Sequence, residues 1–135
     1  MKLTQLSATI SRPGPADWFT GQAWMEDLGT LPTPTPIRAL RVTFVPGART
    51  AWHTHPLGQL LYILDGVARI GCEGEAVCEA QAGDSVAFAP GERHWHGAAP
   101  GRLMTHLALQ ATDPEAGAET LWEEHVSDDA YGETG

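Results

Sequence analysis

Short runs of alternating apolar and polar residues, each bounded by turn-forming residues, dominate the middle of this chain. Alternation with a period of two is typical of strands that bury one face. The breaks hold glycine, proline and aspartate, which favour turns. The pattern predicts strands at 39–45, 51–55, 59–64, 67–72, 76–80, 85–89, 94–97 and 103–110. Many short strands without helical periodicity between them indicate an all-β, single-domain antiparallel barrel or sandwich.

The two ends of the chain follow a different pattern. Residues 1–37 hold small apolar runs, the aromatic pair Trp18-Phe19 and alternating prolines, so they predict an extended N-terminal arm and a proline-rich connector. The apolar part of the N-terminal arm is expected to pack as an edge strand on the barrel of the same chain or on a partner subunit. Residues 38–112 are expected to form the barrel. Residues 113–135 form an acidic C-terminal tail with a short amphipathic piece at 121–126.

Composition narrows the classes of partner. A chain of 135 residues with 42% hydrophobic residues can bury a core as one domain. A net charge of -9 and a single lysine argue against nucleic acid and anionic membranes as partners. The chain has neither a bilayer-spanning apolar run nor a signal-peptide pattern, so a cytoplasmic location is expected. Cys72 and Cys78 flank a predicted turn, which makes a disulfide sterically feasible without implying one.

Four side chains predict a metal site. His53 and His55 alternate and share a strand face, Gln59 begins the next strand after a turn, and His94 follows a Pro-Gly turn. Three imidazoles and one amide oxygen suit a first-row divalent metal, with Mn²⁺ or Fe²⁺ fitting an octahedral site that keeps two positions open. Ni²⁺ and Zn²⁺ are also feasible, because most protein sites bind these ions more tightly than Mn²⁺. Because glutamine is neutral, the centre keeps its full +2 charge, which favours Lewis-acid over oxidative chemistry.

Residues around these four supply candidates for catalysis and for pocket walls. His96 shares parity with His94, and His106 lies on the strand face that also carries Gln110, so we expect these three to be catalytic or to act as hydrogen-bonding supports. The inward positions expected to line a substrate pocket, or alternatively to be core, are Leu40, Val42, Phe44, Thr50, Leu61, Met104 and Ala108. An inward Leu40 would limit substrate size. Trp52 and Trp95 have the opposite parity and are assigned to packing or a subunit interface.

These motifs resemble those of a known family. Gly47, five residues, His53-x-His55, three residues, Gln59, six residues and Gly66 resemble the first cupin motif, and Gly83-Asp84 with Pro90-Gly91-x-x-His94 resembles the second. The chain departs from the usual pattern in having Gln59 for glutamate, Pro90 directly before Gly91, and Ala98 where asparagine is frequent. The resemblance implies a cupin barrel, that is, a double-stranded jelly roll.

A narrower resemblance covers nearly the whole chain. Segments 14–21, 46–59, 90–100 and 104–108 are similar to the small bacterial cupin hydroxynitrile lyases, which also carry glutamine at the third ligand position. This resemblance implies a manganese-dependent carbon–carbon lyase for a small-molecule substrate. Such an enzyme cleaves or forms cyanohydrins, typically of (R) configuration, for example mandelonitrile from benzaldehyde and HCN. Small cupins of this kind often form homodimers through the N-terminal strand, so a homodimer or homotetramer is expected.

Three functions follow as hypotheses. In the leading one, the ion lowers the pKa of a cyanohydrin hydroxyl and neutral His106, with His96, takes its proton as general base. The first alternative is a metal-dependent cupin oxygenase, which oxygen uptake would reveal. The second is a non-catalytic binding module for a small anion, which predicts tight binding without turnover.

Overall fold

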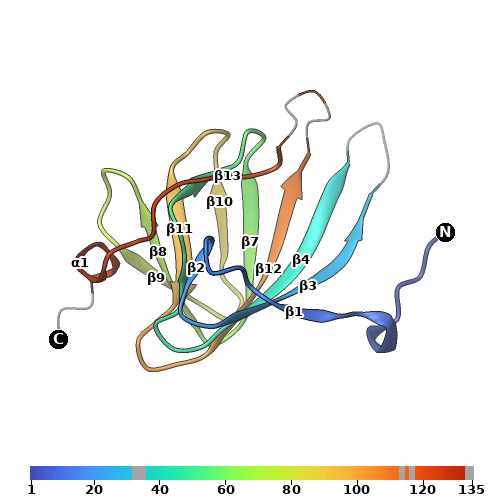
Figure 1. The fold of residues 1–135 in the computed structure, drawn as a ribbon, viewed down its shortest axis with the longest axis horizontal. Helices are drawn as coiled ribbons and strands as arrows, with labels where there is room; N and C mark the ends of the chain where they lie inside the picture. Colours follow the sequence, from blue (N-terminus) through green and yellow to red (C-terminus); the bar gives the residue numbers. More distant parts are fainter. Residues whose placement is uncertain (32–35, 113–114, 116–117, 133–135) are drawn as a thin grey trace.

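The computed structural model describes residues 1–31, 36–112, 115 and 118–132, and in these residues two antiparallel sheets enclose the core (Figure 1). The first sheet has the strand order β1-β3-β4-β12-β7-β10. Its strands are β1 (Ser11–Pro13), β3 (Ala23–Thr30), β4 (Ile37–Phe44), β12 (Met104–Ala111), β7 (Gln59–Asp65) and β10 (Ser85–Phe88).

The second sheet has the order β13-β6-β11-β5-β2, with β8 beside β11 and β9 beside β8. Its strands are β2 (Phe19–Thr20), β5 (Arg49–Thr50), β6 (His53–Thr54), β8 (Val67–Cys72), β9 (Cys78–Gln81), β11 (His94–Ala98) and β13 (Leu121–Trp122). The helices are η1 (Leu6–Ala8) and α1 (Asp128–Tyr131). This architecture confirms the predicted all-β antiparallel barrel. No helix among the described residues is long and apolar enough to span a membrane.

The strand expected at 51–55 is shorter in the structure, where only 53–54 of it lies in a strand. Residues 49–50 and 53–54 form β5 and β6, and the two residues between them bond elsewhere. The Ala51 amide donates to the Trp18 carbonyl and the Trp52 amide to the Glu124 carbonyl. The backbone between β5 and β6 is therefore hydrogen-bonded to segments from both ends of the chain. Local alternation of apolar and polar residues does not predict such distant partners.

Both ends of the chain pack against the barrel. β3 pairs with β4 along its length, so the sheet extends N-terminally of residue 38, and β1 forms its edge within the same chain. Residues 32–35 of the expected connector lie outside the described residues. At the other end, β13 pairs with β6, and Ser127 caps α1 by accepting a hydrogen bond from the Ala130 amide. Figure 1 shows this C-terminal segment crossing the barrel before it reaches α1.

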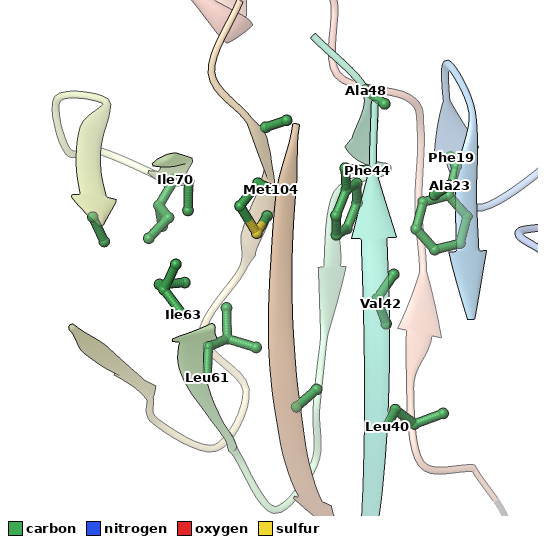
Figure 2. Close-up of a cluster of buried hydrophobic side chains, with 14 of the residues drawn as sticks. Phe19, Ala23, Leu40, Val42, Phe44, Ala48, Leu61, Ile63, Ile70 and Met104 are labelled. Atoms are coloured by element: carbon green, nitrogen blue, oxygen red, sulfur yellow. The ribbon is translucent and has the colours of Figure 1, made fainter. Parts of the chain in front are cut away.

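Inward-facing residues of both sheets form the core. Along β12, Met104, His106, Ala108 and Gln110 are buried and the residues between them are half-buried, as the alternation predicts. Figure 2 shows Leu40, Val42 and Phe44 in a row along β4. A second cluster joins Trp95 to Val126 and Tyr131 of the C-terminal segment, so packing explains the opposite parity of Trp95.

The two cysteines are both free. Cys78 lies opposite Ile70 in the β8–β9 pairing, so Cys72 is its diagonal neighbour on the same face. Diagonal Cα atoms in such a pair lie about 7–8 Å apart, beyond the usual disulfide range. Cys72 instead donates to Glu92, and burial raises the pKa of its thiol to about 12.

Candidate metal centre and pocket

Three histidines meet inside the barrel where β6 and β11 pair. His53 lies directly opposite His94 in this pairing, and His55 follows β6 on the same side. The ring centroids are 4.3 Å apart for His53 and His94, 5.0 Å for His53 and His55, and 5.6 Å for His55 and His94. All three side chains are buried. The structure thus brings together the three imidazoles that the sequence nominated as ligands.

A backbone carbonyl fixes the orientation of each of these rings. Nδ1 of His53 lies 2.9 Å from the Ala51 oxygen, Nδ1 of His94 lies 2.8 Å from the Glu92 oxygen, and Nδ1 of His55 lies 3.0 Å from the Glu119 oxygen. A carbonyl only accepts, so Nδ1 must carry the proton and Nε2 the lone pair. Metal-binding histidines are usually held in this way. Nε2 of His55 is buried and has no hydrogen-bond partner among the described residues.

Gln59 adds an amide oxygen to the group. The turn before β7 closes with a hydrogen bond from the Gly58 amide to the His55 oxygen, and Gly58 has a positive φ of 82°, which only glycine adopts readily. Oε1 of Gln59 then lies 3.1 Å from Nε2 of His94. Both atoms offer lone pairs once Nδ1 of His94 holds the proton, so a cation between them resolves their contact. The donor set His53, His55, Gln59 and His94 fits a divalent metal.

His96 makes a second ligand set geometrically feasible. One ring nitrogen from each of His53, His94 and His96 can lie within 4.8 Å of the others. The two sets share His53 and His94 and differ in the third histidine. Nδ1 of His96 lies 3.0 Å from Nε2 of His106, which leaves its own Nε2 for a ligand. The His96 ring, however, lies farther from the His53 and His94 rings than His55 does, with centroids 5.3 and 5.9 Å away against 5.0 and 5.6 Å. These distances favour the set that contains His55.

His96 and His106 form a buried imidazole pair beside the candidate ligands. Their ring centroids are 4.7 Å apart, and Phe44 packs against both rings. Within the described part of the chain, the outer nitrogens, Nε2 of His96 and Nδ1 of His106, have no partner. Burial lowers the pKa of His106 to about 4 and holds the pKa of His96 well below its usual value. Both rings are therefore neutral near pH 7, and each has a nitrogen available to a ligand.

An apolar cavity opens next to these histidines. The expected wall residues Leu40, Val42, Phe44, Thr50 and Ala108 line it, as do His53, His55, Gln59, His96, His106 and Gln110. Leu61 and Met104 are not among the described residues that line the cavity, and they take the alternative role expected for this group, that of core residues. Their side chains point inward but belong to the fully buried hydrophobic core with Ile63. Alternation gives the face of a strand but not the distance of each residue from the cavity.

Residues from both ends of the chain complete the cavity, and the sequence did not identify them. They are Phe19, Met25, Thr120 and Trp122. The Trp122 ring stacks on Trp18, with centroids 5.0 Å apart, and lies 4.7 Å from the ring of His53. Trp18-Phe19 and the amphipathic piece near residue 121 were visible as apolar signals. Nothing in their spacing connects segments about a hundred residues apart.

Buried neutral histidines make the metal-free protein acid-sensitive. Burial lowers the pKa of both His94 and His106 to about 4, against 6.5 for a free imidazole. Between these two pKa values the unfolded chain binds more protons than the folded chain. The free energy of unfolding contributed by the neutral histidines is therefore complete above about pH 6.5 and is lost as the pH falls toward 4. Each residue contributes up to about 3 kcal/mol. We expect the urea midpoint of the metal-free protein to fall steeply between pH 7 and pH 4.5, and a constant midpoint would contradict this.

Known proteins resemble this chain along nearly all of its length. The model of the family described as "Cupin domain" matches residues 40–107. A protein named (R)-mandelonitrile lyase from Granulicella tundricola is 49% identical over 131 residues, covering 97% of this chain and 98% of that protein. A cupin-like protein of Thermotoga maritima is 34% identical, with a TM-score of 0.75 over 88% of this chain and 89% of that one. The polyketide cyclase of Streptomyces resistomycificus shares the fold, with 19% identity and a TM-score of 0.66 over 97% and 90% of the two chains.

Proposed function

This chain belongs to the cupin family, and from that premise we propose that it is a metal-dependent hydroxynitrile lyase. The reaction splits a cyanohydrin such as mandelonitrile into an aldehyde and HCN, or runs in reverse. The observation that carries the proposal is the neutral, partly unpartnered His96–His106 pair, which faces the same apolar cavity as the candidate ligands His53, His55 and Gln59. The 49% identity to a mandelonitrile lyase over nearly the full length supports the choice of substrate.

We assign the divalent metal to His53, His55, Gln59 and His94, with Mn²⁺ as the favoured ion and Fe²⁺, Ni²⁺ or Zn²⁺ as substitutes. Four neutral ligands leave the charge of the ion undiminished. When bound, the ion supplies a Lewis acid that polarises the hydroxyl oxygen of the substrate. The chemistry requires no change of oxidation state.

The imidazole pair moves the proton. With its proton on Nε2, His106 donates to Nδ1 of His96, and its own Nδ1 lone pair is free to take the hydroxyl proton of the cyanohydrin. The carbonyl forms as the bond to the nitrile carbon breaks, and the bonding electrons leave with cyanide. The imidazolium then returns the proton, which releases HCN. The contact with His96 allows the positive charge to spread over two rings while the proton is held.

The apolar walls orient the rest of the substrate. Phe44, Val42 and Leu40 line the cavity beside the imidazole pair, and Phe19 and Trp122 line it from other segments. These walls suit an aromatic or aliphatic group and exclude water from the reacting atoms.

The direct test is cleavage of racemic mandelonitrile by Mn²⁺-loaded protein. Benzaldehyde is followed by absorbance, and the spontaneous rate is subtracted with a sample of metal-free protein. We expect benzaldehyde to form well above the spontaneous rate. Failure to accelerate the reaction, with one bound metal per chain verified by elemental analysis, would remove this proposal.

Leu40 is expected to set the size limit of the substrate. It lies opposite Ala108 in the β4–β12 pairing, is nearly fully buried, and lines the cavity. In the Leu40→Ala variant, the kcat/KM for a bulky aromatic cyanohydrin relative to acetone cyanohydrin should rise about tenfold, since a few methylene groups of pocket space have effects of this order. Leu107→Ala, on the outer face of β12, is the matched control and should leave the ratio unchanged.

The outer face of β7 suits self-association. Leu60, Tyr62 and Leu64 form an exposed apolar row there. Rows of this kind on a sheet favour burial against another surface. On this basis we propose a homodimer or homotetramer.

A further inference from the structure

Four side chains form a hydrogen-bonded row that leads from the surface to the candidate metal centre. The Arg38 guanidinium lies 3.5 Å from Oε1 of Glu119. The Gln110 amide nitrogen donates to the same carboxylate. The Gln59 amide nitrogen donates to Oε1 of Gln110 over 2.8 Å. The row ends at Oε1 of Gln59, beside His94.

Glu119 sets the direction of every hydrogen bond in this row. A carboxylate accepts and does not donate, so Gln110 must turn its NH₂ group toward Glu119. Its carbonyl oxygen then faces Gln59, which must answer with its own NH₂ group. Only the oxygen of Gln59 remains to face the centre. An amide reversed at either position would set two donors or two acceptors against each other, at the cost of an unsatisfied buried group.

We propose that Glu119 is a positioning residue that, through Gln110, presents the oxygen rather than the nitrogen of Gln59 to the metal. The role deepens the proposed function, because it rests on Gln59 as a ligand. It gives Gln110 a structural task in place of the catalytic one expected from the sequence. A glutamine ligand needs such a partner, because its amide oxygen and its NH₂ group are nearly equal in size but opposite in polarity, and only the oxygen can bind a metal.

The backbone of the same segment orients a second ligand. The carbonyl oxygen of Glu119 lies 3.0 Å from Nδ1 of His55, and the Thr120 hydroxyl lies 3.3 Å from the same nitrogen. A two-residue stretch thus fixes both His55 and Gln59. Because partners behind the ligands hold metal-binding residues in orientation, their loss typically costs about 10- to 100-fold in affinity.

The first experiment measures metal affinity in Glu119→Gln. A glutamine here can either accept or donate, so Gln110 and Gln59 lose their enforced direction. We expect the dissociation constant for Mn²⁺, measured by calorimetry, to rise about 10- to 100-fold. Glu123→Gln is the control, because Glu123 is an acid of the same segment that pairs with Arg93 at the surface. Equal affinity in the two variants would overturn the proposal.

The second experiment reverses the row in metal-free protein. Gln59→Glu places a carboxylate at each end, and Gln110 can turn its NH₂ group to only one of them. Adding Glu119→Gln restores a consistent row in the opposite direction. We expect Glu119→Gln to raise the melting temperature by about 3 °C or more in the Gln59→Glu background, but to lower it or leave it unchanged in the wild-type background.

If Glu119 were merely structural, Glu119→Gln would change the melting temperature by the same amount in both backgrounds. That result would refute the claim that Glu119 sets the direction of the hydrogen bonds. Since this second measurement needs neither metal nor substrate, it separates the two proposals. A reversed sign together with an inactive wild-type enzyme would refute the lyase function and support the row. Additive melting temperatures with an active enzyme would do the opposite.

Discussion

His55→Ala is expected to weaken metal binding by roughly 100-fold, whereas His96→Ala is expected to leave the metal bound. Nε2 of His55 is buried and free of hydrogen bonds within the described residues, and its Nδ1 is held by a carbonyl. The His96 ring lies farther than the His55 ring from both His53 and His94, with centroids 5.3 and 5.9 Å away against 5.0 and 5.6 Å. A structural metal contributes on the order of 10–16 kcal/mol through about four ligands, so one ligand carries about 3 kcal/mol, which is a factor of about 100.

The measurement is the content of divalent metal after dialysis against a weak chelator, with the dissociation constant determined by titration. Both variants remove one buried imidazole from the same cavity, so each controls for the loss of packing in the other. The reverse pattern, with metal lost only in His96→Ala, would assign the ion to the His53, His94 and His96 set. The ligand assignment proposed above would then be wrong.

His106→Ala is expected to lower kcat by about 10²- to 10⁴-fold without loss of metal. General base catalysis contributes this range, and His106 is neutral at pH 7 because burial lowers its pKa to about 4. His106 lines the cavity and is bonded to His96 rather than to one of the four residues that we assign as ligands. The substitution should therefore remove proton transfer while leaving the metal centre intact.

The assay compares cleavage of mandelonitrile by metal-loaded His106→Ala and wild type, each with its metal content measured. His125→Ala is the matched control, since His125 is an exposed histidine that contacts Thr20 at the surface. It should retain full activity. A His106→Ala enzyme that keeps its kcat would exclude His106 as the base and direct attention to Nε2 of His96.

The sequence alone predicted the barrel and the clustering of the candidate ligands. Alternation gave the strands near 59–64, 67–72 and 103–110 almost as observed, because each of them buries one face. The same alternation placed His106 and Gln110 inward on β12. Two short motifs pointed to His53, His55 and His94, but the pairing of β6 with β11 across about forty residues is what brings His94 opposite His53.

Contacts between distant segments account for what the sequence could not predict. Glu119 and Thr120 bond to His55, and Trp122 covers His53, across more than sixty residues of chain. These residues lie in a stretch read as an acidic tail, because charge pattern reports solvation and not the partner that a backbone carbonyl will find. The shortening of the strand expected at 51–55 to 53–54 has the same origin, because the Ala51 and Trp52 amides donate to the carbonyls of Trp18 and Glu124.

The order in which residues are synthesised affects when the candidate metal centre can form. Every candidate ligand is synthesised before residues 119–122, which supply the carbonyl behind His55 and the ring beside His53. A nascent chain therefore carries the donors before it carries the supports that orient them. β13 (Leu121–Trp122) leaves the ribosome after all of the candidate ligands and completes the site, so we expect tight capture of a metal ion to require completion of the described fold.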